Sequence, residues 1–279
     1  MGVSVFGHRG ACGYLPENTM ASFELAFDLG SDAIEFDVVM TKDGIPVILH
    51  DLELSHTTSI ADHQELAKLV CDISYDELSQ LRVTERYPEG RPESAKNSGK
   101  FPVPTLREVL TNPKFDGQHL IIEIKYGQLL ATMGLDVIAA IKRELEASNW
   151  AERQMRITIE CFEFGILRQA KKIIAGDIDY VFLSAPDMLP VGRTSLEDDL
   201  LDEIAAEFEG LSVSIPMIWE SNLVLRVKER GLKLFTYTAR IETSQGSVDE
   251  WFRKLALSGV DGIFCDQPDL MLKTVASLS

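Results

Sequence analysis

The amino-acid sequence predicts an α/β fold: a (β/α)8 TIM barrel with a small insertion after the second strand and its hairpin. Short apolar or β-branched runs alternate with longer segments of helical pattern almost from end to end, which is typical of parallel strands joined by helices. The chain has 279 residues, of which 45% are hydrophobic, and this is enough for one domain of barrel size.

The expected parallel strands are short and rich in Val, Ile, Leu and Phe. They cover residues 3–7, 33–38, 120–124, 157–161, 180–184, 211–215, 233–237 and 262–265. An open doubly wound sheet is the alternative arrangement, but the first strand is not followed by the GxGxxG turn typical of that fold. The number of strands therefore favours the closed barrel.

A ninth strand is expected over 46–50, and it differs from the others in direction. It follows the second strand through VMTKDGI, in which Asp43-Gly44 provides a tight turn. Because a parallel neighbour needs about a dozen linking residues, this strand must return antiparallel as a hairpin. Residues 52–101 are polar and loosely patterned, and we expect them to form an insertion within a single domain that spans 1–279.

Helices fit between the expected strands. Thr19 can cap a helix that runs to Leu29 and ends at Gly30. The pattern predicts further helices over 129–149 and 222–230.

The composition limits the partners of the protein. Lys and Arg number 27 against 44 Asp and Glu, for a net charge of −17, so nucleic acids and anionic membranes would be repelled. The four cysteines are scattered, without a CxxC pair, and predict neither a zinc site nor disulfides. Without a signal segment or an apolar run of about 18 residues, we expect a cytoplasmic protein with no stable membrane association.

Charged side chains lie at the ends of two expected barrel strands. In AIEFDVV, alternation places Glu35 and Asp37 on one face, and in LIIEIKYG it does the same for Glu123 and Lys125. Solvated residues on an edge strand would give the same pattern. However, barrel active sites form at the carboxyl ends of several strands, so two such pairs favour a functional site.

Two histidines converge on these charges. His8 and Arg9 follow the first strand, and the hairpin returns His50 to about the level of Glu35 and Asp37. Oxygen ligands favour one divalent cation, Mg²⁺ or Ca²⁺, because no cysteine joins them. An arginine fork and a lysine suit phosphate oxygens, so we expect a small phosphate-bearing ligand.

Four motifs, HRGACGYLPENT, IEFDVVMTKDGIPVILHD, IEIK and GVDGIFCDQPDL, together resemble the glycerophosphodiester phosphodiesterase family, in order over nearly the whole chain. The resemblance implies hydrolysis of glycerophosphodiesters to glycerol 3-phosphate and an alcohol. It also implies two acid–base histidines, three carboxylates that bind the divalent cation, and two cationic side chains on the phosphate. The matching positions are, in that order, His8 and His50; Glu35, Asp37 and Glu123; and Arg9 and Lys125.

The resemblance further implies that the glycerol 2-hydroxyl attacks phosphorus to give a cyclic phosphodiester, which water then opens; either histidine could begin as the base. Two positions depart from the family pattern. Cys161-Phe162 stands where Ser-Phe is frequent, and Tyr237-Thr238-Ala239-Arg240 stands where Trp-Thr-Val-Asn is common. We expect Tyr237 to line the substrate pocket, and we expect the departures to affect the choice of substrate rather than the reaction.

Two other functions fit parts of the sequence. One is an enzyme that acts on lipid phosphodiesters, as related phospholipases do, and the other is a non-hydrolytic barrel that binds a phosphate ligand. The pair of histidines argues against the second. Apolar residues in the insertion have helical spacing that a lipid enzyme could use, but they more readily seal the insertion onto the barrel: Leu66, Leu69, Val70 and Ile73.

Overall fold

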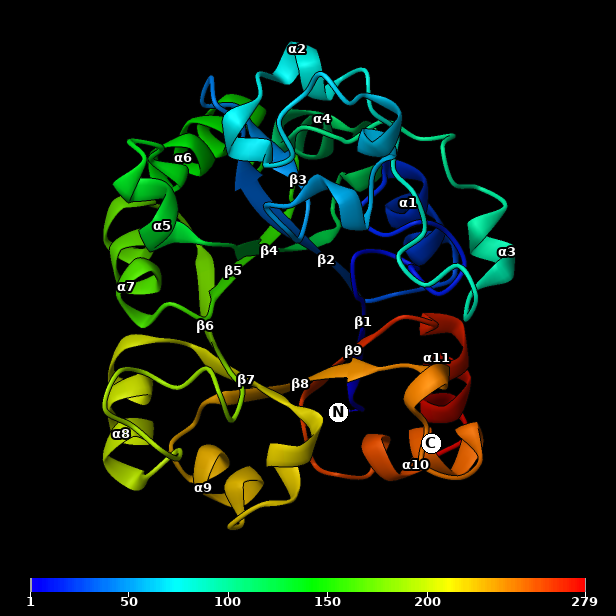
Figure 1. Cartoon of the computed structure of the whole chain (residues 1–279). Helices are drawn as coiled ribbons and strands as arrows, with labels where there is room; N and C mark the ends of the chain where they lie inside the picture. Colours follow the sequence, from blue (N-terminus) through cyan, green and yellow to red (C-terminus); the bar gives the residue numbers. More distant parts are fainter. Residues whose placement is uncertain (1, 279) are drawn as a thin grey trace.

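Parallel strands form a closed ring in the computed structural model, which describes residues 2–278 (Figure 1). The strands are β1 (Ser4–Gly7), β2 (Ala33–Met40), β4 (His119–Ile124), β5 (Arg156–Cys161), β6 (Ile178–Ser184), β7 (Gly210–Ser214), β8 (Lys233–Ala239) and β9 (Gly262–Cys265). Their order is β1-β9-β8-β7-β6-β5-β4-β2, and the pairing of β1 with β2 closes the ring. The predicted barrel is confirmed, and the open sheet is excluded.

The hairpin strand β3 (Pro46–Ile48) pairs antiparallel with β2, as expected, with Val38 opposite Ile48. Gly44 at the turn has φ +79°, a conformation that glycine adopts without strain. Beyond β3, the amide of Leu49 donates a hydrogen bond of 3.1 Å to the carbonyl of Asp37. This bond brings the next residue, His50, back to the level of the acidic residues of β2.

Helices surround the ring on its outer side (Figure 1). They are α1 (Met20–Asp28), α4 (Leu106–Thr111), α5 (Gly127–Thr132), α6 (Val137–Ser148), α7 (Phe164–Ile173), α8 (Asp198–Glu207), α9 (Leu223–Glu229), α10 (Val248–Ala256) and α11 (Pro268–Ala276). Short 3₁₀ turns η4 (Pro113–Phe115), η5 (Ile215–Trp219) and η6 (Ile241–Thr243) lie in the connections. Among the described residues, no helix combines the length and apolar character needed to cross a bilayer.

The expected start of α1 is confirmed. The Thr19 hydroxyl accepts a hydrogen bond of 3.2 Å from the amide of Ser22, and Gly30 follows the helix with φ +95°. The single helix expected over 129–149 is wrong, because α5 and α6 replace it. Gly134, at φ +78°, interrupts the helical path, and the Asp136 carboxylate caps α6 by accepting from the amide of Ala139.

The barrel interior changes from apolar to acidic along its strands. An apolar cluster fills the interior, and it comprises Phe6, Ala33, Ile121, Val181, Phe235 and Phe264. On β2, the residues that alternate inward from Ala33 are Glu35 and Asp37. The apolar cluster therefore forms a floor beneath acidic groups at the carboxyl ends of the strands.

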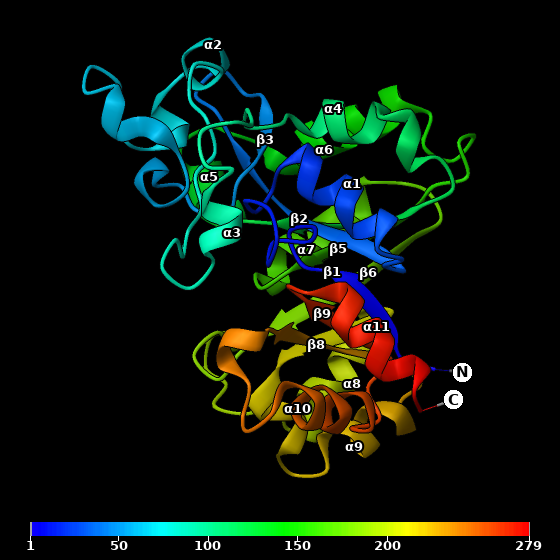
Figure 2. The same ribbon diagram turned by 90° about the vertical axis from the view of Figure 1, so that its right-hand side faces the viewer.

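The segment between β3 and α4 lies at one end of the barrel, on one side of the ring. It contains η1 (Leu54–His56), η2 (Ser59–Asp62), η3 (Val70–Asp72), α2 (Tyr75–Leu78) and α3 (Pro92–Ala95). Figure 2 shows α2 and α3 at the end of the barrel away from both termini. Val70 and Ile73 are buried and Leu66 packs against the core, whereas Leu69 is 38% exposed. The apolar spacing of this segment therefore serves mainly to attach it to the barrel.

Candidate active site

Three buried carboxylates from two barrel strands meet at the carboxyl end of the barrel. The parallel register of β2 and β4 places Asp37 beside Glu123, and Glu35 lies one inward position earlier on β2. One carboxylate oxygen from each of the three residues lies within 4.8 Å of the other two. The structure thus brings together the acidic residues that the sequence places on separate strands.

The chemistry of this cluster fits a hard cation. Glu35 Oε1 and Asp37 Oδ1 are buried and accept no hydrogen bond from any described residue. Buried oxygens are normally paired, and oxygen-only sites of this kind suit Mg²⁺ or Ca²⁺. Burial raises the pKa of Glu35, and the charges of Asp37 and Glu123 raise it further. A bound cation would relieve this repulsion.

Arg9 and Lys125 lie against the same carboxylates. The backbone amide of Arg9 donates a hydrogen bond of 3.0 Å to Glu35 Oε2, and the side-chain Nε of Arg9 lies 3.1 Å from Asp37 Oδ2. Lys125 Nζ donates to Glu123 Oε1 at 2.6 Å and lies 3.4 Å from Asp37 Oδ1. Burial alone would raise the pKa of Asp37, but Arg9 and Lys125 outweigh it and hold that pKa well below its usual value.

His8 is fixed by a carboxylate that follows β9. Its Nδ1 lies 2.7 Å from Asp266 Oδ1, and because an ionised carboxylate only accepts, Nδ1 carries the proton. The other ring nitrogen, Nε2, is then a free acceptor. Burial and the charge of Arg9 lower the pKa of His8 to about 4, although Asp266 opposes this shift. The imidazole is therefore neutral at pH 7.

His50 has the same arrangement on the hairpin side. Its Nδ1 lies 2.7 Å from Oδ1 of the adjacent Asp51. Both histidines face one cavity of about 240 Å³, which is lined by His8, Arg9, Glu35, His50, Glu123, Lys125, Glu160, Phe162, Leu183, Tyr237, Thr238, Arg240 and Phe264. The two rings therefore share a space large enough for a phosphodiester group.

Two arginines of the insertion bind the carboxylates that hold the histidines. Arg91 donates through Nη2 to Asp266 Oδ2 and through Nη1 to the carbonyl of Cys12 at 2.8 Å. Arg86 Nη2 lies 2.7 Å from Asp51 Oδ2, and its Nε donates to Glu17 Oε2 at 2.9 Å. Neither contact is predictable from the sequence, since a polar loop gives no signal of where its side chains reach.

Glu160 is a further buried carboxylate, and it is not among the site residues predicted from the sequence. The register of β4 and β5 places it beside Glu123, and its Oε2 has no hydrogen-bond partner within the described part of the chain. Burial raises the pKa of Glu160, and the charges of Glu35 and Glu123 add to this. Its inward position in RITIEC could have been found by the same alternation that identifies Glu35 and Asp37.

The positions that depart from the family pattern lie in different places. Tyr237 lines the cavity as expected, and its hydroxyl donates a hydrogen bond of 2.7 Å to the carbonyl of Ser184. The Cys161 thiol points into the outer core and donates to the carbonyl of Ile124 at 3.2 Å. Arg240 lies at the rim, with Nε 3.4 Å from Asp266 Oδ2.

Comparisons with known proteins find relatives that match nearly the whole chain. Relatives named glycerophosphodiester phosphodiesterase include a Bacillus subtilis protein, 29% identical over 95% of this chain and 84% of its own length. One from Caldanaerobacter subterraneus subsp. tengcongensis is 31% identical over 97% of each chain.

Solved structures show the same fold. A Silicibacter pomeroyi protein superposes with a TM-score of 0.81 at 26% identity, over 99% of this chain and 94% of its own. An Oleispira antarctica phosphodiesterase, solved with its product sn-glycerol-3-phosphate, gives a TM-score of 0.75 at 24% identity, over 99% and 97% of the two chains. A family model described as the glycerophosphoryl diester phosphodiesterase family matches residues 8–270. The chain therefore belongs to the glycerophosphoryl diester phosphodiesterase family.

Proposed function

We propose that this protein is a metal-dependent enzyme that hydrolyses glycerophosphodiesters to glycerol 3-phosphate and an alcohol. The observation that carries the proposal is that two histidines, each bound to a carboxylate through Nδ1, share one cavity with a cluster of three carboxylates. The names of the Bacillus and Caldanaerobacter relatives support the same activity.

Glu35, Asp37 and Glu123 would hold one divalent cation, Mg²⁺ or Ca²⁺. When bound, such an ion supplies positive charge that stabilises the developing negative charge of a phosphoryl transfer. Arg9 and Lys125 lie within hydrogen-bond or ion-pair distance of these carboxylates and would bind the phosphate oxygens from the same side. A planar fork and a point charge are both suited to this task.

His8 would act as the first base and His50 as the first acid. His8 accepts the proton of the glycerol 2-hydroxyl at Nε2 while that oxygen bonds to phosphorus. His50 donates a proton from Nε2 to the departing alcohol oxygen as its bond to phosphorus breaks. The product is a cyclic phosphodiester, and its opening by water reverses the two proton transfers. The neutral state of His8 at pH 7 supports this assignment.

Asp266 and Asp51 would orient the two rings. Each accepts the Nδ1 proton, which keeps Nε2 directed to the cavity and stabilises the imidazolium that forms during turnover. We further propose that residues 1–279 work as one domain with 52–101 as its insertion, since Arg86 and Arg91 of that segment contact these aspartates.

Product analysis tests the proposed function. The purified protein is incubated with glycerophosphocholine, glycerophosphoethanolamine and glycerophosphoinositol, with Mg²⁺, with Ca²⁺ and with a chelator. We expect glycerol 3-phosphate only when a cation is present. No product from any of these substrates would overturn the proposal and favour a binding barrel. If the protein instead released the headgroup only from a lysophospholipid assayed in parallel, a lipid enzyme would be favoured.

A further inference from the structure

A groove lies beside the active-site cavity, at the ends of β7 and β8. It is lined by Ile215, Pro216, Trp219, Tyr237, Thr238, Arg240, Thr243, Gln245, Trp251 and Lys254. Tyr237, Thr238 and Arg240 line the active-site cavity as well, so the two spaces adjoin each other at these residues. We call this space the β8 groove.

The β8 groove lies across the barrel from the acidic cluster. In the ring order, β8 is opposite β4, which carries Glu123 and leads into Lys125. A substrate with its glycerol and phosphate at the β2 and β4 side can therefore extend its alcohol toward β8. The groove is where that alcohol would lie.

The charge of the β8 groove differs from that of the rest of the protein. The chain has a net charge of −17, yet the residues lining the groove include two cations, Arg240 and Lys254, and neither Asp nor Glu. Lys254 forms no ion pair with any residue from 2 to 278, whereas Arg240 Nε lies 3.4 Å from Asp266. The groove therefore offers positive charge to a ligand.

Aromatic rings also line the β8 groove, but their cation site is filled. Lys254 Nζ lies 4.7 Å from the centroid of Trp219 and 5.6 Å from that of Trp251. An ammonium group over an indole occupies the place that a quaternary ammonium ligand would take. Trp219 remains 43% exposed, so part of its ring surface is available to the carbon face of a ligand.

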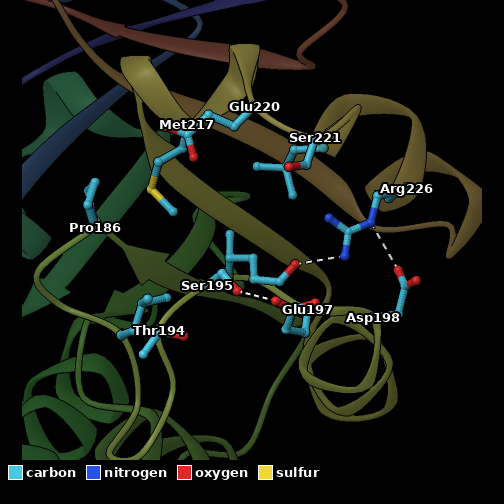
Figure 3. Close-up of a pocket in the computed structure, with 12 residues that line it drawn as sticks. Pro186, Thr194, Ser195, Glu197, Asp198, Met217, Glu220, Ser221 and Arg226 are labelled. Carbon is cyan, nitrogen blue, oxygen red and sulfur yellow. Dashed lines mark hydrogen bonds and ion pairs between the residues drawn. The ribbon is translucent and has the colours of Figure 1, made fainter.

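A second pocket beside η5 differs from the β8 groove in the charge of its lining residues. It has a volume of about 320 Å³ and includes Glu197, Asp198 and Glu220. This pocket also contains Arg226. Figure 3 shows the Arg226 guanidinium paired with Asp198 and with a backbone carbonyl, that of Leu196. Among residues 2–278, none lines both this pocket and the active-site cavity. It therefore offers neither a free cation nor a path to the reacting phosphate.

We propose that the β8 groove binds the alcohol part of the substrate and selects alcohols that are rich in hydroxyls and uncharged or negatively charged, such as inositol and its phosphates. Lys254 and Arg240 donate hydrogen bonds to hydroxyl or anionic oxygens, and the indole of Trp219 packs against the ring. The quaternary ammonium of choline is repelled by both cations. This inference rests on the proposed function of the adjoining cavity.

The test is the ratio of kcat/KM for glycerophosphoinositol to that for glycerophosphocholine. We expect a ratio of at least about 10 in the wild-type protein and a drop of about tenfold or more in Lys254→Glu, the size of effect that about 1.4 kcal/mol produces. Lys254→Gln should lie between them. Lys228→Gln, which changes an exposed lysine of α9 outside the groove, should keep the wild-type ratio. Glycerophosphomethanol is too short to reach the groove and should be hydrolysed equally by all four proteins.

The outcomes separate the two proposals. Hydrolysis with the same ratio in wild type and Lys254→Glu, or with a preference for choline, would overturn the role of the groove and leave the proposed function standing. Absence of hydrolysis, even of glycerophosphomethanol, would overturn the proposed function. In that case, calorimetric titration of glycerophosphoinositol and glycerophosphocholine tests the groove by itself. Equal affinities for the two compounds would overturn the role of the groove.

Discussion

Each catalytic histidine in the proposed mechanism has a carboxylate on Nδ1 and an open Nε2. We expect His8→Ala and His50→Ala to lower kcat at least about 10²- to 10⁴-fold, the usual contribution of a general acid or base. Both variants should keep their affinity for the cation, because neither ring belongs to the carboxylate cluster. Release of glycerol 3-phosphate under saturating cation measures the effect.

His56→Ala is the matched control. His56 also approaches Asp51, with Nδ1 3.3 Å from Oδ2, but its side chain is 54% exposed and it does not line the cavity described above. Its removal should leave kcat near the wild-type value. If His56→Ala and His50→Ala reduced turnover to the same degree, the assignment of His50 as the acid would be wrong.

The environment of His8 also predicts the pH dependence of the reaction. Burial and Arg9 lower its pKa to about 4, so the base is lost by protonation only as the pH falls through that value. We expect the acidic limb of kcat/KM to have its midpoint near 4 rather than near the ordinary histidine value of about 6.5. Circular dichroism at each pH confirms that the chain remains folded. A limb centred near 6.5 would show that His8 is not the initial base.

The strands of the site are predictable from sequence because two simple rules apply to them. Alternation within AIEFDVV directs Glu35 and Asp37 to one face, and parallel strands of a barrel align their carboxyl ends. The same rules apply to Glu160, but one acid in a strand is not by itself distinguishable from a solvated residue. Only the register with β4 identifies it as part of the cluster.

Other features depend on contacts that sequence patterns do not contain. The division of 129–149 into α5 and α6 depends on Gly134 adopting a positive φ, which apolar periodicity alone does not reveal. Arg91 and Asp266 are 175 positions apart, and only the folded insertion brings them together. The positions of the two histidines can be predicted from the ends of the strands. The contacts of Arg91 with Asp266 and of Arg86 with Asp51 cannot be predicted in this way.

The insertion provides a testable link to catalysis. In Arg91→Ala, Asp266 loses a charge-assisted hydrogen bond, and the ring of His8 loses part of its support. Such a bond is worth about 1.5–3 kcal/mol, so we expect kcat to fall about 10- to 100-fold while KM changes little. Guanidinium ion added at low concentration should restore part of the lost kcat, which a general loss of stability would not permit.

Arg82→Ala is the control for this variant. Its guanidinium belongs to the same insertion but, among residues 2–278, donates only to the carbonyls of Ser79 and Leu81. It should have the wild-type kcat. A folded Arg91→Ala protein with unchanged kcat would show that Arg91 has a structural role only.

The buried carboxylates of the active site lower the free energy of unfolding of the whole molecule when no cation is bound. Burial and mutual repulsion raise the pKa values of Glu35, Glu123 and Glu160, so their ionisation at pH 7 opposes folding. A cation at about 100 times its Kd would stabilise the folded chain by about 2.7 kcal/mol. Because each kcal/mol shifts the Tm of a domain this large by about 2–4 °C, we expect an increase of about 5–10 °C.

Glu35→Gln separates charge from cation binding. The amide keeps an oxygen that can accept from the Arg9 amide, and it removes a carboxylate whose ionised form burial disfavours. We therefore expect the cation-free variant to be at least as stable as the wild type, with its Tm unchanged by Mg²⁺ or Ca²⁺. Differential scanning calorimetry measures both values. An increase in Tm as large as that of the wild type would contradict this view of the cluster.

Calorimetric titration of Mg²⁺ and Ca²⁺ into the purified chain tests whether the carboxylates of Glu35, Asp37 and Glu123 would hold one divalent cation. We expect one bound ion per chain for the wild type and for His50→Ala, and the loss of that binding in Glu35→Ala. Undiminished affinity in Glu35→Ala would contradict it.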